Sequence, residues 1–133
     1  MVQPNGFDIL LVDDEAGIRK ILRLFLEMDG FSVREAVSAQ QARELIAAQC
    51  PDLMVLDVVL CGQTGFEVCE WVKNTPEYAR AKVIMFTALN QGPDINEGIR
   101  VKADLYLTKP QNPRDIIAEI KTLLNISLES TDS

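Results

Sequence analysis

The sequence predicts an α/β protein built on one parallel sheet that carries helices on both faces. Short, wholly apolar segments such as Leu53–Leu56 are typical of strands buried on both sides. These segments alternate with stretches whose apolar residues recur at helical spacing. The connections between them are short, so successive strands are expected to run parallel and to be joined by right-handed crossovers.

The first part of the chain contains two predicted strand and helix pairs. A strand over 7–12 ends in Asp13-Asp14-Glu15, and apolar residues at helical spacing from Ile18 to Leu26 predict a helix. Gly30 is suited to end that helix. Residues 31–36 alternate like a shorter strand, and Ser38–Gln41 has the form of a capping box that opens a second helix, which ends before residue 51.

The second part continues the alternation. The strand over 53–56 leads through a connection at 58–63 to a helix over 64–74, and a fourth strand is predicted at 82–87. A turn at 90–93 and a weakly apolar helix over 94–102 come next. The last strand, 105–108, ends at Lys109-Pro110, and Pro113 begins the final helix. We therefore expect one domain over 1–126, with 127–133 as a polar tail or the start of a linker.

Five strands suit a doubly wound sheet of order 2-1-3-4-5, the flavodoxin-like (βα)5 arrangement. In that order strands 1 and 3 are neighbours at the switch point of the topology, where ligands bind beyond the carboxyl ends of the strands. Asp13 and Asp14 follow strand 1, and Asp57 follows strand 3. The sequence therefore predicts that these three side chains converge.

Composition narrows the classes of function. The chain has 133 residues, 47% of them hydrophobic and 25% charged, which excludes a disordered chain. No apolar run approaches the roughly 18 residues of a membrane span, so we expect a soluble, cytoplasmic protein that does not contact membranes. The net charge of −7 argues against direct binding of nucleic acid by this domain.

The histidine and cysteine content limits the kinds of reactive site that the chain can form. Histidine is absent, which excludes a Ser-His-Asp triad, a Cys-His pair and imidazole ligands to a metal. The three cysteines, Cys50, Cys61 and Cys69, lack the paired spacing of a zinc site and are interpreted as reduced thiols. Carboxylates, hydroxyls and amines remain as the available reactive groups.

Grouped carboxylates need a positive partner. Two like charges about 5 Å apart repel by about 3 kcal/mol at an effective dielectric near 20. A hard divalent cation with oxygen ligands would offset this repulsion, which favours Mg²⁺. The alternative interpretation of residues 13–15 is an acidic helix start.

Strands 4 and 5 bring further groups to the same edge. Thr87 and Ala88 end strand 4, and Lys109 ends strand 5. Taken singly, Thr87 is a turn hydroxyl, Lys109 a solvated cation and Tyr106 a strand aromatic. Together with the acids they suit a site that receives a phosphoryl group, in which Asp57 attacks phosphorus and becomes an acyl phosphate.

At these positions the sequence resembles the receiver domain of two-component response regulators, and the resemblance covers nearly all of Asp8 to Leu124. The matching motifs are Asp13-Asp14, Asp57 with Gly65 eight residues later, Thr87-Ala88, and Tyr106 three residues before Lys109-Pro110. Each motif alone is weak, and the ordered set is specific.

The resemblance implies a role for each position. Asp57 would be the phosphoacceptor, and Mg²⁺ would be held by Asp14, by Asp13 through water, by Asp57 and by the backbone carbonyl of Val59. Lys109 would pair with the phosphoryl group, beside Ala88 and Leu89. Thr87 would move toward a phosphoryl oxygen and Tyr106 would turn inward. This would switch the surface formed by the helix over 94–102, the strand over 105–108 and the helix that begins at Pro113.

The resemblance also implies partners. The phosphoryl donor would be a phosphohistidine on a sensor histidine kinase or a histidine phosphotransfer protein, docked on helix 1 at Ile18, Ile21 and Leu22. An output domain or target protein and a phosphorylation-dependent homodimer are further partners that the sequence leaves open. The chain would be a signalling switch that catalyses its own phosphorylation and slow dephosphorylation, because the apolar Val59 and Leu89 cannot orient an attacking water.

Three alternative functions compete with this interpretation. A phosphatase of the haloacid dehalogenase type needs a second acid two residues after its nucleophile, where this chain has Val59. A flavin-binding module needs a hydroxyl- and glycine-rich loop after strand 1, where residues 13–15 would repel the flavin phosphate. A receiver-fold module that binds proteins without phosphorylation is disfavoured by the complete set of acids and lysine.

Overall fold

The computed structural model describes residues 4–60, 63–88, 101–109 and 111–126, and it contains a five-stranded parallel sheet of order β2-β1-β3-β6-β7. The strands of this sheet are β1 (Asp8–Val12), β2 (Ser32–Ala36), β3 (Leu53–Leu56), β6 (Lys82–Ala88) and β7 (Leu105–Lys109). The described helices are α1 (Ala16–Met28), α2 (Ala39–Ala48), α3 (Gly65–Asn74) and α5 (Pro113–Leu123). The predicted fold class and strand order are confirmed.

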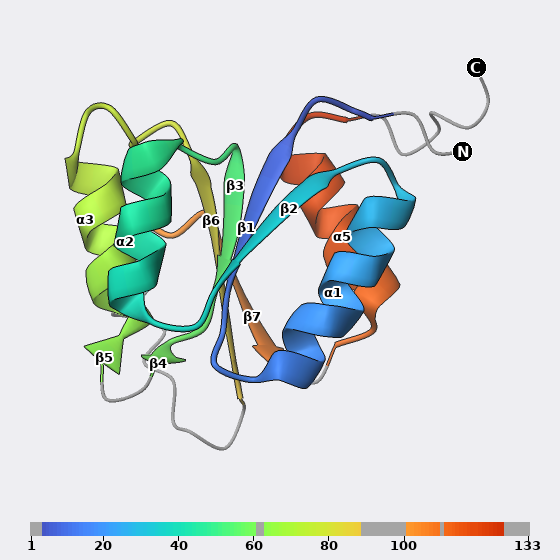
Figure 1. The fold of residues 1–133 in the computed structure, drawn as a ribbon, viewed down its shortest axis with the longest axis horizontal. Coiled ribbons are helices and arrows are strands. Elements are labelled where there is room, and N and C mark those ends of the chain that lie inside the picture. Colours follow the sequence, from blue (N-terminus) through green and yellow to red (C-terminus); the bar gives the residue numbers. More distant parts are fainter. Residues whose placement is uncertain (1–3, 61–62, 89–100, 110, 127–133) are drawn as a thin grey trace.

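The sheet lies between two layers of helices, with α1 and α5 on one face and α2 and α3 on the other (Figure 1). Alternate residues of each strand enter two separate hydrophobic clusters. In β1, Leu10 and Val12 pack toward α2 and α3, whereas Ile9 and Leu11 pack toward α1 and α5. Complete burial of such side chains contributes about 2–3 kcal/mol each, so both faces of the sheet are held by packing.

Local capping explains where the helices begin and end. Gly30 has a φ of 90°, and the N–H groups of Gly30 and Phe31 donate to the carbonyls of Glu27 and Leu26, the pattern of a Schellman motif. At the start of α2, Ser38 Oγ accepts from the Gln41 N–H at 3.1 Å. The Gln41 side chain reaches back to the N–H of residue 37 rather than to that of Ser38, so the predicted capping box is displaced by one residue.

One element differs from the prediction. The connection expected over 58–63 includes a two-stranded antiparallel ribbon, β4 (Val59–Leu60) and β5 (Gln63–Thr64), in which Val59 pairs with Thr64. Strands of two residues are too short to give a periodic signal, so the sequence pattern could not reveal them. After the ribbon the chain returns to the end of β3, and the Gly65 N–H at the start of α3 donates to the carbonyl of Val58.

Several predictions fall outside the described residues. These are the turn at 90–93, the helix at positions 94–100, Leu89, Cys61, Pro110 and the tail at 127–133. Lys102 is described and has a φ of 68°, the left-handed conformation that favours glycine. Within the described part of the chain, no helix combines the length and the apolar character needed to cross a membrane.

Cys50 and Cys69 are free thiols, in agreement with the prediction. Cys69 is buried in α3 against the core, and burial raises the pKa of its thiol to about 12. Its thiol is therefore protonated and unreactive at neutral pH.

Candidate functional site

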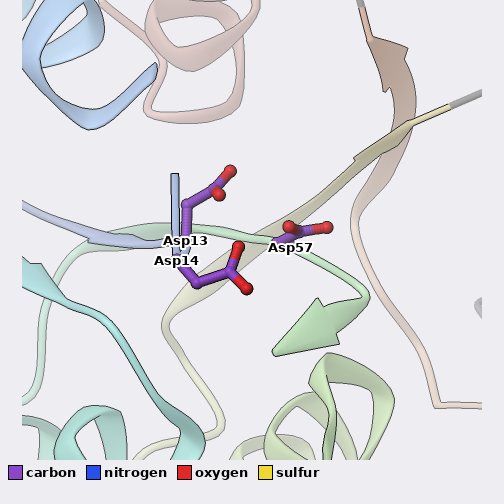
Figure 2. A group of neighbouring side chains, drawn as sticks. All are labelled: Asp13, Asp14 and Asp57. Carbon is purple, nitrogen blue, oxygen red and sulfur yellow. The ribbon is translucent and has the colours of Figure 1, made fainter. Parts of the chain in front are cut away.

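Three carboxylates meet beyond the ends of two neighbouring strands. Asp13 and Asp14 follow β1 and Asp57 follows β3, and the Asp57 N–H donates to the carbonyl of Val12 at 2.9 Å. Each side chain offers one oxygen, and these oxygens lie within 4.8 Å of one another (Figure 2). Asp13 and Asp57 are each 5% exposed, whereas Asp14 is exposed. The predicted convergence is confirmed.

Lys109, at the end of β7, supplies a positive charge to this cluster. Its Nζ lies 2.8 Å from Asp13 Oδ2, 2.9 Å from Glu15 Oε1 and 3.4 Å from Asp57 Oδ2. An ammonium has three N–H donors, so these three carboxylates match its capacity. The Nζ also lies 5.5 Å from the ring centre of the buried Phe86, a cation–π contact.

Burial lowers the pKa of Lys109, but its hydrogen bonds to Asp13 and Glu15 outweigh burial and hold that pKa above its usual value. The side chain is therefore a fixed cation at neutral pH. It neutralises only one of the negative charges carried by Asp13, Asp14, Glu15 and Asp57.

Asp57 shows the effect of the remaining negative charge. Burial raises the pKa of its carboxyl, the charge of Asp13 raises it further, and Lys109 and the Val59 N–H oppose both effects. The net result is a pKa of about 6 instead of 3.8. A hard divalent cation would stabilise the ionised form, and a set of carboxylate oxygens is the donor type that Mg²⁺ prefers. The residues present therefore fit Mg²⁺.

Backbone hydrogen bonds hold Asp13 in place. Its Oδ1 accepts from the Glu15 N–H at 2.9 Å, and its carbonyl accepts from Arg19 Nη1 at 2.6 Å. Arg19 is in turn paired with Glu35 on β2, at 2.8 Å. These contacts fix the loop between β1 and α1 from both sides.

Glu15 and Arg19 have roles in the site that the sequence pattern did not predict. Glu15 occupies the N-cap position of α1, but its side chain makes no capping hydrogen bond and instead contacts Lys109. The interpretation of residues 13–15 as a simple acidic helix start is therefore not supported for Glu15. The sequence does contain a signal for a further role of Glu15. One acid is enough to cap a helix, and Glu15 is the third acid in succession.

Thr87 and Tyr106 lie on the same face of neighbouring strands. The register pairs Met85 with Tyr106. Thr87 lies two residues after Met85 on β6, so its side chain is on the same face of the sheet as those of Met85 and Tyr106. Thr87 is completely buried, and its Oγ1 has no hydrogen-bond partner among the described residues. A buried hydroxyl in that condition costs about 1–3 kcal/mol, which makes it available to an incoming oxygen. The Tyr106 hydroxyl is also buried.

Ala88 and Val59, two other predicted site residues, lie at the rim of the same site. Ala88 ends β6 and is paired in register with Lys109. Val59 is 42% exposed, and its N–H donates to Asp57 Oδ1 at 3.3 Å. Leu89 lies outside the described residues.

An apolar groove opens beside the cluster, between α1 and the start of α5. Its volume is about 410 Å³, and its lining includes the three residues predicted for docking, Ile18, Ile21 and Leu22. Glu15 and Lys109 form its polar end. Ile21 is 45% exposed, so an apolar surface adjoins the charged site.

Comparison with known proteins identifies the family. Residues 9–121 match the response regulator receiver domain. The chain is 40% identical over 119 residues to the phosphate regulon transcriptional regulatory protein PhoB of Pseudomonas aeruginosa, covering 90% of this chain and 52% of that protein. It is 38% identical over 120 residues to the transcriptional regulatory protein GltR of the same organism, covering 90% and 50%. The chain thus spans about half the length of these relatives.

Solved structures agree with this match. A response regulator from Chloroflexus aurantiacus has a TM-score of 0.82 at 31% identity, covering 92% of this chain and 99% of that one. A CheY-like receiver from Methanospirillum hungatei has a TM-score of 0.80 at 29% identity, covering 94% and 95%. The BeF3-activated DrrB receiver domain has a TM-score of 0.77 at 29% identity, covering 94% and 99%. With its acidic pocket and adjacent lysine, the chain belongs to the receiver domains of two-component response regulators.

Proposed function

We propose that this receiver accepts a phosphoryl group on Asp57 from a phosphohistidine of a partner protein. A carboxylate oxygen of Asp57 attacks phosphorus, the P–N bond to the imidazole breaks, and the imidazole takes up a proton as it leaves. The main support is the meeting of Asp13, Asp14, Asp57 and Lys109 at one edge of the sheet in a chain of this family. Lys109, held as a cation, stabilises charge on the transferred group.

Mg²⁺ is the metal that we propose for this site, held by Asp13, Asp14, Asp57 and the backbone carbonyl of Val59. When bound, it would neutralise charge on the phosphoryl oxygens. The residues themselves position the nucleophile: the Val59 N–H donates to one oxygen of Asp57, and Lys109 lies by the other.

The proposed switch passes through Thr87. Its buried hydroxyl would donate to a phosphoryl oxygen, and Tyr106, on the same sheet face, would adjust its position in response. This would change the outer surface of β7 and α5. This changed surface would be recognised by one of three partners: an output domain following the proposed receiver unit of residues 1–126, a separate target protein, or a second copy of the chain.

A histidine kinase or histidine phosphotransfer protein is the proposed donor, because this chain has no histidine. We place its docking surface at the apolar groove of Ile18, Ile21 and Leu22, which adjoins Lys109. If Ile21→Asp slowed phosphorylation by a histidine donor and by acetyl phosphate equally, that placement would be wrong.

Incubation with acetyl phosphate and Mg²⁺ tests the proposed function. We expect the intact mass to increase by one phosphoryl group in the wild type and in Asp115→Asn, which removes an exposed acid of α5. We expect no increase in Asp57→Asn or after removal of Mg²⁺ with a chelator. A wild type that stays unmodified would favour the alternative function, a module that binds proteins without phosphorylation.

The acyl phosphate is expected to hydrolyse slowly, because the side chain of Val59 offers no hydrogen bond to an attacking water. Val59→Asn should shorten its lifetime about tenfold, since one hydrogen bond of ~1.4 kcal/mol corresponds to that factor. Val59→Ala is the control for the loss of bulk and should change the lifetime little. The decay of phosphorylated protein, followed by mass after removal of acetyl phosphate, measures both. A wild-type half-life of seconds in the presence of Mg²⁺ would contradict this account.

A further inference from the structure

We propose that Glu15 is a positioning residue that holds Lys109 back from Asp57 and so opposes the phosphorylated state. This inference rests on the proposed function. It starts from the unequal distances around Lys109 Nζ, which lies 2.8 Å from Asp13 and 2.9 Å from Glu15, but 3.4 Å from Asp57. In this structure the ammonium therefore favours the loop after β1 over the phosphoacceptor.

A phosphoryl group on Asp57 would change this competition. It adds charged oxygens, which form short, strong hydrogen bonds with an ammonium. Lys109 has three N–H donors, and all three already face carboxylates. The ammonium lies closer to Asp13 and Glu15 than to Asp57, so a close bond to the phosphoryl group requires it to move away from at least one of these two residues.

Glu15 is the partner that Lys109 can release at the lowest cost. The side chain of Glu15 is 59% exposed, so water can replace the lost hydrogen bond. The side chain of Asp13 is only 7% exposed and would be left as a buried, unpaired charge. Of the two short contacts of Lys109, the one to Glu15 is thus the one that breaks when the ammonium moves closer to a phosphoryl group on Asp57.

If Glu15 stabilises only the unphosphorylated arrangement, removing its charge should favour binding of an acyl-phosphate mimic. The probe is beryllium fluoride in the presence of Mg²⁺, with the dissociation constant measured by calorimetry. We expect Glu15→Gln to bind the probe about two- to fivefold more tightly than the wild type, the range for an exposed ion pair. Glu27→Gln, which removes an exposed acid of α1 that is paired with Arg23, should leave the affinity unchanged.

A double-mutant cycle separates this contact from the general effect of charge. In a Lys109→Gln background, Glu15→Gln should lose its effect on the affinity, because the group it restrains is gone. An equal gain in both backgrounds would mean that Glu15 acts through charge alone, and a loss of affinity would mean that it supports the site. Either result overturns the inference. A wild type that does not bind the probe would instead overturn the proposed function itself.

Discussion

Replacement of Gly65 by alanine is expected to lower the free energy of unfolding by about 3 kcal/mol. A Cβ at this position would collide with the backbone oxygen of Asp57 and would lie 3.2 Å from the Leu56 side chain. The oxygen belongs to the main chain of the site and cannot rotate away. Because α3 and the end of β3 must separate, the variant should also accept phosphoryl groups from acetyl phosphate more slowly.

Gly17→Ala is the matched control for the change at Gly65. Gly17 lies in α1, and a Cβ there would meet nothing within 4 Å. Alanine in a helix is favoured over glycine by about 0.5–1 kcal/mol, so this variant should be more stable than the wild type. Urea denaturation of both variants measures the difference. A Gly65→Ala protein as stable as Gly17→Ala would show that the close approach at Asp57 is not rigid.

The family motif contains Gly65, but the sequence pattern did not give the reason for it. Glycine in a sequence usually indicates a turn or the C-terminal end of a helix, and Gly65 lies at neither. It is the first residue of α3, packed against the main chain of Asp57 through contacts that depend on the β4–β5 ribbon. Such a contact joins elements in three dimensions and leaves no periodic trace along the chain.

The sheet and its acids, in contrast, could be predicted. Strands such as Leu53–Leu56 are apolar at every position because both faces are covered, which makes them recognisable without neighbours. Once the strand order was inferred, the positions of Asp13, Asp57 and Lys109 followed from topology, since parallel strands end at the same edge.

The contacts between individual side chains could not be predicted from the strand order. Which carboxylates Lys109 contacts depends on rotamers and on the start of α1, so Glu15 was recognised only in the structure. The same holds for Arg19, whose guanidinium bonds to the carbonyl of Asp13 rather than to a side chain of the site.

Asp57→Asn is expected to make the metal-free protein more stable at pH 7, by up to ~3 kcal/mol. The carboxyl of Asp57 has a pKa of about 6 in the folded chain against 3.8 normally, because burial and the charge of Asp13 disfavour its ionised form. The folded state therefore binds this proton more tightly than the unfolded state. The stability linked to Asp57 is present below about pH 4 and is lost as the pH rises through 6. Asparagine removes this penalty and keeps an oxygen for the Val59 N–H.

Asp8→Asn is expected to destabilise the protein, whereas Asp57→Asn stabilises it. A comparison of the two variants therefore distinguishes the site at Asp57 from buried acids in general. Asp8 is also buried, but both of its oxygens are paired with Arg34, at 2.6 and 3.2 Å. Asp8→Asn should therefore destabilise the protein at pH 7, by about 3 kcal/mol. Urea midpoints measured from pH 3.5 to 8 should converge for the wild type and Asp57→Asn at the acid end. Added Mg²⁺ should narrow their difference at pH 7, because a cation bound to the ionised wild-type site stabilises that site alone. Equal midpoints at all pH values would mean that Asp57 carries no electrostatic penalty, and the case for a cation at this edge of the sheet would lose its physical basis.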